Sequence, residues 1–169
     1  YRFDGVDDVI NLDALGVALS VAGNTTGAIR WVGSLQDMSS DYDRYWSFGN
    51  SGVNEYVSLG SHTVNGTLFC SFKVGGTDQW VFTSDKAFSE DTILDIILVQ
   101  NGTSPVLYVN GTLEAITFVT STDLTVWFAD ATGIDQGRIG CLKVDGANSN
   151  FSKQTCSFFG VTNFAPTAS

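Results

Sequence analysis

The segment ILDIILVQNGTSPVLYVNGTL (Ile93–Leu113) determines the fold expected for this chain. It contains three short runs rich in Ile, Leu, Val and Tyr, separated by two Asn-Gly pairs. Asn tolerates the positive φ angles that tight hairpin turns require, and Gly adopts them freely. The segment therefore predicts antiparallel strands at Ile93–Gln100, Val106–Asn110 and Leu113–Phe118.

The same pattern of β-prone runs and Gly, Asn, Asp or Ser turns extends in both directions, with almost no helical periodicity. Many short strands with turn signals between them predict an all-β protein built as an antiparallel two-sheet β-sandwich or barrel. We expect one domain over residues 1–164, followed by an exit segment at 165–169 that has lost the apolar pattern. The other expected strands are Val9–Leu12, Ala18–Ala22, Ala28–Leu35, Tyr45–Gly49, Glu55–Leu59, Thr67–Val74, Gln79–Thr83, Leu124–Ala129, Gly137–Lys143 and Ser157–Phe164.

The strand at Ile93–Gln100 is apolar on both faces, which predicts a central position in a sheet that is covered on both sides. Asp95 interrupts one of those faces. A buried carboxylate needs hydrogen-bond or charge partners. We interpret Asp95 as part of a structural network, with a functional carboxylate as the alternative.

Charge limits the classes of partner. The 169 residues include 18 Asp and Glu but only 8 Lys and Arg, for a net charge of -10. Proteins that bind nucleic acid present a basic face, so we expect no nucleic-acid partner. The longest apolar run, Thr92–Val99, is interrupted by Asp95 and is too short to span a bilayer, so we expect no membrane insertion.

The three cysteines show neither CxxC spacing nor a neighbouring histidine, so a zinc site is not expected. Cys70 shares a strand face with Leu68 and Phe72 and is predicted to be a small buried apolar residue. Cys141 and Cys156 could form a disulfide outside a reducing compartment, and spacing alone leaves that open.

Two longer phrases resemble a known superfamily. FDGVDDVINL (Phe3–Leu12) is similar to the opening strand of laminin G-like, concanavalin A-like jelly-roll domains, and Ile93–Leu113 resembles their central hairpin. WSFGN (Trp46–Asn50) and GRIG (Gly137–Gly140) follow in the expected order. The resemblance implies two packed antiparallel sheets, one of them concave, with ligands bound at the loop rim or across the concave face. It also implies calcium-assisted binding of glycans or proteins, in secreted proteins, adhesins or viral surface and tail proteins.

Gln36–Asn50 holds the densest mixture of aromatic and polar residues in the chain. Aromatic rings can stack on sugar rings, while acidic and amide side chains bind sugar hydroxyls. Trp46 and the strand tryptophans Trp80 and Trp127 are expected in the core instead. The predicted ligand-binding residues are Asp41, Tyr42, Asp43, Arg44 and Tyr45.

Calcium is the metal that the acidic loops suit best, because hard cations choose carboxylate and carbonyl oxygens. The predicted ligands are Asp37, Asp130 and Asp135, and the Asp7-Asp8 pair offers a further acidic loop. Solvated turn acids are the alternative.

Catalysis is not expected. Retaining glycosidases of this architecture carry two carboxylates about 5 Å apart. Glu90, Asp91 and Asp95 have the wrong spacing for that pair, and His62 is the only histidine. A nucleophile elbow is also missing.

The sequence therefore predicts a non-catalytic recognition or adhesion module that binds a glycan or a surface protein, located extracellularly or on a virion surface. The alternative is a structural virion module that contacts other copies of itself or capsid and tail proteins. A glycoside hydrolase is the lesser alternative.

Overall fold

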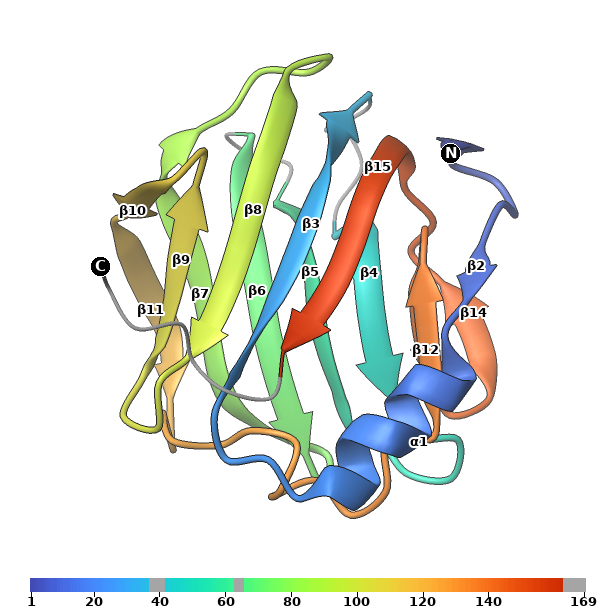
Figure 1. The fold of residues 1–169 in the computed structure, drawn as a ribbon, viewed down its shortest axis with the longest axis vertical. Coiled ribbons are helices and arrows are strands. Elements are labelled where there is room, and N and C mark those ends of the chain that lie inside the picture. Colours follow the sequence, from blue (N-terminus) through green and yellow to red (C-terminus); the bar gives the residue numbers. More distant parts are fainter. Residues whose placement is uncertain (37–41, 63–65, 163–169) are drawn as a thin grey trace.

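The computed structural model describes residues 1–36, 42–62 and 66–162. Within those residues, the chain forms two antiparallel sheets packed face to face and a separate hairpin (Figure 1), which confirms the predicted sandwich. The six-stranded sheet has the order β1 (Arg2–Asp4), β15 (Lys153–Thr162), β3 (Gly27–Leu35), β8 (Ile93–Gln100), β9 (Pro105–Val109) and β10 (Thr112–Glu114). The seven-stranded sheet has the order β11 (Ile116–Ser121), β7 (Thr77–Ala87), β6 (Thr67–Val74), β5 (Tyr56–His62), β4 (Arg44–Gly49), β12 (Gln136–Ile139) and β2 (Ile10–Asn11). The hairpin pairs β13 (Leu142–Val144) with β14 (Ala147–Ser149).

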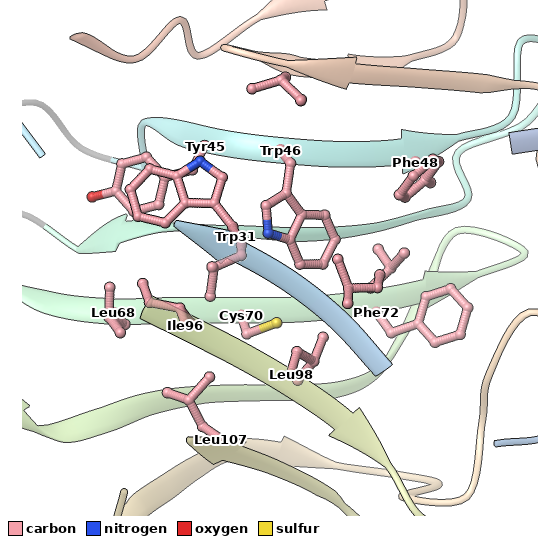
Figure 2. Close-up of a cluster of buried hydrophobic side chains, with 14 of the residues drawn as sticks. Trp31, Tyr45, Trp46, Phe48, Leu68, Cys70, Phe72, Ile96, Leu98 and Leu107 are labelled. Atoms are coloured by element: carbon pink, nitrogen blue, oxygen red, sulfur yellow. The ribbon is translucent and has the colours of Figure 1, made fainter. Parts of the chain in front are cut away.

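Aromatic side chains fill the space between the two sheets (Figure 2). The ring of Trp31 on β3 stacks on that of Tyr45 on β4, with 5.4 Å between the ring centroids. The predicted core positions of Trp46, Trp80 and Trp127 are confirmed, since each is at most 1% exposed. Such large apolar surfaces dominate the burial that stabilises the fold.

The strand β8 confirms part of its prediction and corrects the rest. It lies between β3 and β9, so it is central in its sheet. Its outer face is open at the start of the strand, where Ile93 is 70% exposed and the Asp95 side chain is 31% exposed, and is covered at Val99, which is 3% exposed. Asp95 is therefore not buried, and it accepts hydrogen bonds from Nε and Nη2 of Arg30 at 2.8 and 2.7 Å. This ion pair is consistent with a structural role.

A helix replaces the strand predicted at Ala18–Ala22. The helix α1 (Asp13–Ala22) begins with an acidic residue in its first turn and ends at Gly23, whose φ of 61° is left-handed. Ala and Leu favour helices, and Asp stabilises a helix N-terminus. Its buried residues, Gly16 and Leu19, are three positions apart and so share one face. The alternating pattern required of a half-buried strand is absent here.

The segment predicted as a strand at Leu124–Ala129 consists of turns instead. Its apolar character has another cause, because Val126, Trp127 and Phe128 are at most 5% exposed. The carbonyl of Val126 accepts hydrogen bonds from Trp80 Nε1 and Gln100 Nε2 at 3.3 and 3.0 Å. A loop that covers the end of the core must be apolar without joining a sheet.

Two predicted strands are each divided. Leu113–Phe118 becomes β10 and β11, which belong to different sheets, so the chain crosses between the sheets at Ala115. Gly137–Lys143 becomes β12 and β13, separated at Gly140, where φ is 103°. A Cβ atom there would lie 2.6 Å from the carbonyl oxygen of Asp8, so glycine permits the bend.

All three cysteines are buried and free, so Cys141 and Cys156 form no disulfide. Cys70 is fully buried as predicted. Desolvation raises the pKa of the Cys141 thiol to about 11, which keeps it protonated and unreactive at neutral pH. Within the described ranges, no helix has the length and apolar character needed to cross a membrane.

The buried carboxylate of Glu55 connects three parts of the chain. It is fully buried and accepts hydrogen bonds from the main-chain N–H of Gly75 at 3.0 Å and of Thr132 at 2.9 Å. The Thr132 hydroxyl also donates to it. Hydrogen bonds to a buried charge contribute more than neutral ones.

We predict that Glu55→Gln lowers the free energy of unfolding by about 2–3 kcal/mol, because the amide replaces one acceptor by a donor facing other donors. Urea denaturation measures the change. Glu114→Gln is the control, since the hydrogen bond that Glu114 accepts from the main-chain N–H of Lys86 lies on the surface, and it should change stability by less than about 0.5 kcal/mol. Equal effects of the two variants would contradict this role of Glu55.

Candidate functional site

A bulge at the start of β4 determines which way Arg44 points. The register with β5 shifts between Arg44 and Trp46, so Tyr45 is an extra residue in the strand. Both Tyr45 and Trp46 face the core, as Figure 2 shows. Arg44 lies instead on the outer face, against Phe69. Bulges commonly redirect side chains in this way.

The segment that leads into β4 lies directly on β5. The N–H of Ser61 donates to the carbonyl of Asp43 at 3.0 Å. A Cβ atom on Gly60 would lie 1.9 Å from that carbonyl oxygen, so only glycine permits the approach. Tyr42 has a φ of 66°, which is rare for a bulky residue. Such backbone strain occurs preferentially at functional sites.

The outer face of the seven-stranded sheet carries a shallow pocket of about 340 Å³ beside this segment. That volume lies in the range of small-ligand pockets. Its walls combine aromatic rings, aliphatic side chains and hydroxyl groups. The lining residues are Tyr42, Arg44, Tyr56, Phe69, Ser71, Asp78, Val81, Val119 and Thr120.

Arg44 is a buried cation in this pocket. It is 4% exposed, and its guanidinium carbon lies 4.7 Å from the ring centroid of Phe69. Its Nη1 donates to the Tyr42 carbonyl at 2.7 Å, but Nε has no hydrogen-bond partner among the described residues. Desolvation lowers the pKa of Arg44, and the neighbouring Tyr56 opposes that shift only in part. A buried guanidinium with an unused donor favours an anionic ligand.

Aromatic rings surround the cation and reach the surface. Tyr42 is 38% exposed and meets the rings of His62 and Phe69 edge-on, at 5.3 and 5.1 Å between centroids. At the opposite end, Lys73 pairs with Asp78 at 3.3 Å and lies 5.7 Å from the ring of Tyr56. The pocket therefore presents rings, a cation and polar rim groups together.

The structure places two of the predicted ligand-binding residues in the lining of this pocket and two others outside it. Tyr42 and Arg44 line the pocket, whereas Asp43 and Tyr45 do not, and Tyr45 is fully buried in the core. Asp41 lies outside the described residues. Tyr45 does not line the pocket because the bulge turns its side chain into the core.

Sequence reasoning missed the strand residues of the pocket. Tyr56, Phe69 and Ser71 come from β5 and β6. A signal was present, because Phe69 and Ser71 alternate with the buried Leu68 and Cys70 and so must face outward. Phe69 is only partly buried, and a phenylalanine on the outer face in mid-strand indicates a contact surface.

Two of the predicted metal ligands, Asp130 and Asp135, accept hydrogen bonds from main-chain donors. Asp130 accepts the N–H of Trp127 at 2.9 Å and stabilises its own turn, whereas Asp135 accepts the N–H of Ser51 at 2.8 Å and joins two segments that are distant in sequence. Asp37 lies outside the described residues. Calcium binding stays a prediction.

One group of three carboxylates does occur in the described part of the chain. Ligand oxygens of Asp4, Asp7 and Asp8 lie within 4.8 Å of one another, and all three residues are exposed. Asp8 accepts the N–H of Asp4 and Asp4 accepts that of Val6. These bonds make the Asp4-Gly5 segment a turn beside β1.

Another hollow, of about 370 Å³, lies elsewhere in the described structure. Two of its polar groups are already used by main-chain donors. Asn110 accepts the N–H of Asp95 and Glu114 accepts that of Lys86. The pocket at Arg44 is therefore the better candidate, because it retains an unused buried donor.

No family model matches the chain, and neither does any curated protein. Solved structures do. The CBM40 domain of the Ruminococcus gnavus IT-sialidase, bound to α2,3-sialyllactose, is 15% identical with a TM-score of 0.77, over 98% of this chain and 88% of that one. A K499G mutant of the NanB sialidase from Streptococcus pneumoniae is 14% identical with a TM-score of 0.77, over 99% of this chain and 26% of that one.

The leech intramolecular trans-sialidase complexed with 2,7-anhydro-Neu5Ac is 19% identical with a TM-score of 0.72, over 98% of this chain and 25% of that one. The chain thus spans about a quarter of each of these two longer enzymes. At such identities the likeness establishes the fold, an antiparallel β-sandwich, and nothing finer.

We predict that Gly60→Ala lowers the free energy of unfolding by about 1–3 kcal/mol, because the new methyl group displaces the Asp43 carbonyl. Thermal and urea unfolding measure it. Gly52→Ala is the matched control, since the nearest atom to its Cβ would be 3.7 Å away. An unchanged stability in Gly60→Ala would show that the segment at Tyr42–Asp43 does not lie on β5 as described.

Proposed function

We propose that this chain is a non-catalytic glycan-binding module of the laminin G-like, concanavalin A-like kind, working extracellularly or on a virion surface. The observation that carries the proposal is Arg44, a buried guanidinium with an unused Nε donor in a pocket where Tyr42 is 38% exposed. A cation for an acidic group and rings for sugar faces are what an acidic sugar requires.

The ligand class follows from these groups. A sugar carboxylate accepts hydrogen bonds from the Arg44 guanidinium, while the rings of Tyr42 and Tyr56 cover the sugar's apolar face. The hydroxyl of Thr120 binds a sugar hydroxyl. Structural neighbours that are named as complexes with sialyllactose support a sialylated glycan as this ligand.

The same pocket supports binding over hydrolysis. Asp78 is the one carboxylate among its described lining residues, and it already pairs with Lys73. Glycoside hydrolysis by the usual route needs two. Asp95, the functional carboxylate that the sequence offered as an alternative, lies on the six-stranded sheet and accepts a hydrogen bond from Arg30 there.

We predict that α2,3-sialyllactose binds to the pocket and that lactose binds at least about tenfold more weakly, because lactose lacks the carboxylate. Tyr42→Ala should weaken sialyllactose by about tenfold or more, through lost ring contact. Isothermal titration calorimetry measures both affinities. Tyr1→Ala is the control, since Tyr1 is 86% exposed and outside the pocket.

Equal affinity for the two sugars would contradict the role of Arg44. Retained affinity in Tyr42→Ala would contradict the location of the binding site in this pocket. Arg44→Lys provides a further variant, because it keeps the charge and loses the planar fork that binds carboxylates.

A structural role in an assembly is the second candidate. An apolar hollow of about 330 Å³ lies on the outer face of the six-stranded sheet, where Phe158 is 49% exposed. Exposed aromatic patches commonly mark protein contacts, here with capsid or tail proteins. Absence of any glycan binding would favour this candidate.

Calcium dependence is proposed from the resemblance to laminin G-like domains, with Asp37, Asp130 and Asp135 as ligands. We predict that calcium chloride raises the melting temperature and that Asp135→Asn abolishes the rise. A ligand at one hundred times its Kd adds about 2.7 kcal/mol to the free energy of unfolding. No rise in the parent chain would overturn calcium binding. A rise lost only in Asp7→Asn would overturn this ligand set.

A further inference from the structure

We propose that two copies of this chain pair antiparallel through β11, the open edge of the seven-stranded sheet, next to the glycan pocket. Four strands form the sheet edges within the described residues (Figure 1). Three of these are only two or three residues long: β1, β2 and β10. The fourth, β11, has six residues. Short edges resist pairing with another chain, and longer ones invite it.

The sequence of β11, ITFVTS, carries no charge and no proline. Its β-branched residues favour strand pairing. The edges β1 and β10 contain Arg, Asp or Glu, which protect an edge from pairing. On a chain with a net charge of -10, an uncharged edge is also where like-charge repulsion is smallest.

The free edge of β11 has no partner strand in the described part of the chain. Among the described residues, every hydrogen bond recorded for its main-chain groups belongs to the ladder with β7. Thr117, Val119 and Ser121 are exposed, with Val119 at 69%. Unpaired main-chain donors and acceptors in a row are a template for another strand.

A second copy is the occupant that fits this edge. The partner strand should be uncharged and rich in β-branched residues, and β11 itself meets both requirements. A twofold axis pairs the two strands antiparallel, which is the geometry of the commonest homodimers. The acidic groups nearest the edge are Asp85, which accepts from the Thr117 hydroxyl, and Asp123 and Glu114 at the strand ends. Their mutual repulsion should make pairing stronger in high salt.

Pairing through β11 brings the glycan pockets of the two copies close to each other. Val119 and Thr120 line it, so the pocket is closed by the Tyr42 segment on one side and ends at β11 on the other. A twofold axis that continues a sheet runs perpendicular to it, so both outer faces point the same way. Two pockets would then lie side by side, which raises avidity for a multivalent surface. Only this bivalency rests on the proposed function; the pairing does not.

The association should be weak. The register shift between Phe118 and Thr120 bends β11, and bulges reduce edge pairing. A contact built mainly from one six-residue strand belongs to the small, transient class of interfaces.

Sedimentation velocity of the ligand-free chain, from about 10 μM to 1 mM, tests the pairing. We expect a monomer–dimer equilibrium that shifts toward dimer with concentration and with salt. The double variant Thr117→Lys/Ser121→Lys should be monomeric throughout, because lysines protect an edge. These two residues do not line the pocket, so affinity for monovalent sialyllactose should be unchanged.

The matched control is Thr112→Lys/Leu113→Lys on the three-residue edge β10, which should still dimerise. A parent chain that stays monomeric at 1 mM, or a dimer that persists in the β11 variant while melting temperatures are equal, would overturn the proposal. Dimerisation without glycan binding would uphold the pairing and contradict only the proposed function.

Discussion

The contact on which the site depends is the stack of Trp31 on Tyr45 between the two sheets, with ring planes 21° apart. Tyr45 reaches this position only because β4 contains a bulge there. The bulge places two consecutive large residues, Tyr45 and Trp46, in the core and leaves Arg44 outside. The free energy gained by burying two aromatic side chains thus offsets the cost of desolvating the Arg44 guanidinium. An isolated strand, which buries no core, could not offset that cost.

Neighbouring loops then hold Arg44 in place. Its main-chain N–H donates to the Asn150 carbonyl at 3.0 Å, and the Ser152 hydroxyl donates to the Arg44 carbonyl at 2.8 Å. The Tyr42 carbonyl accepts a hydrogen bond from Nη1 of the Arg44 side chain. A cation whose main chain and side chain are both bonded loses little further entropy when a ligand arrives, and preorganisation of that kind favours binding.

Local sequence predicted the sandwich and its central hairpin well, because β8 and β9 combine β-prone residues with explicit turn chemistry. It failed where apolar residues serve another purpose. Leu19 is apolar because α1 packs on the sheet, and Trp127 is apolar because a loop covers the core. Apolar runs alone do not distinguish these cases from strands.

For the site, the sequence by itself identified the aromatic and charged segment and two of its pocket residues, Tyr42 and Arg44. Tertiary structure alone decided that Tyr45 turns inward and that Phe69, distant in sequence, joins Arg44 on the outer face. The physical reason is that hydrophobic periodicity records which residues are buried, whereas a bulge and a strand register decide which faces meet. Register depends on pairing between distant segments, and no local pattern contains it.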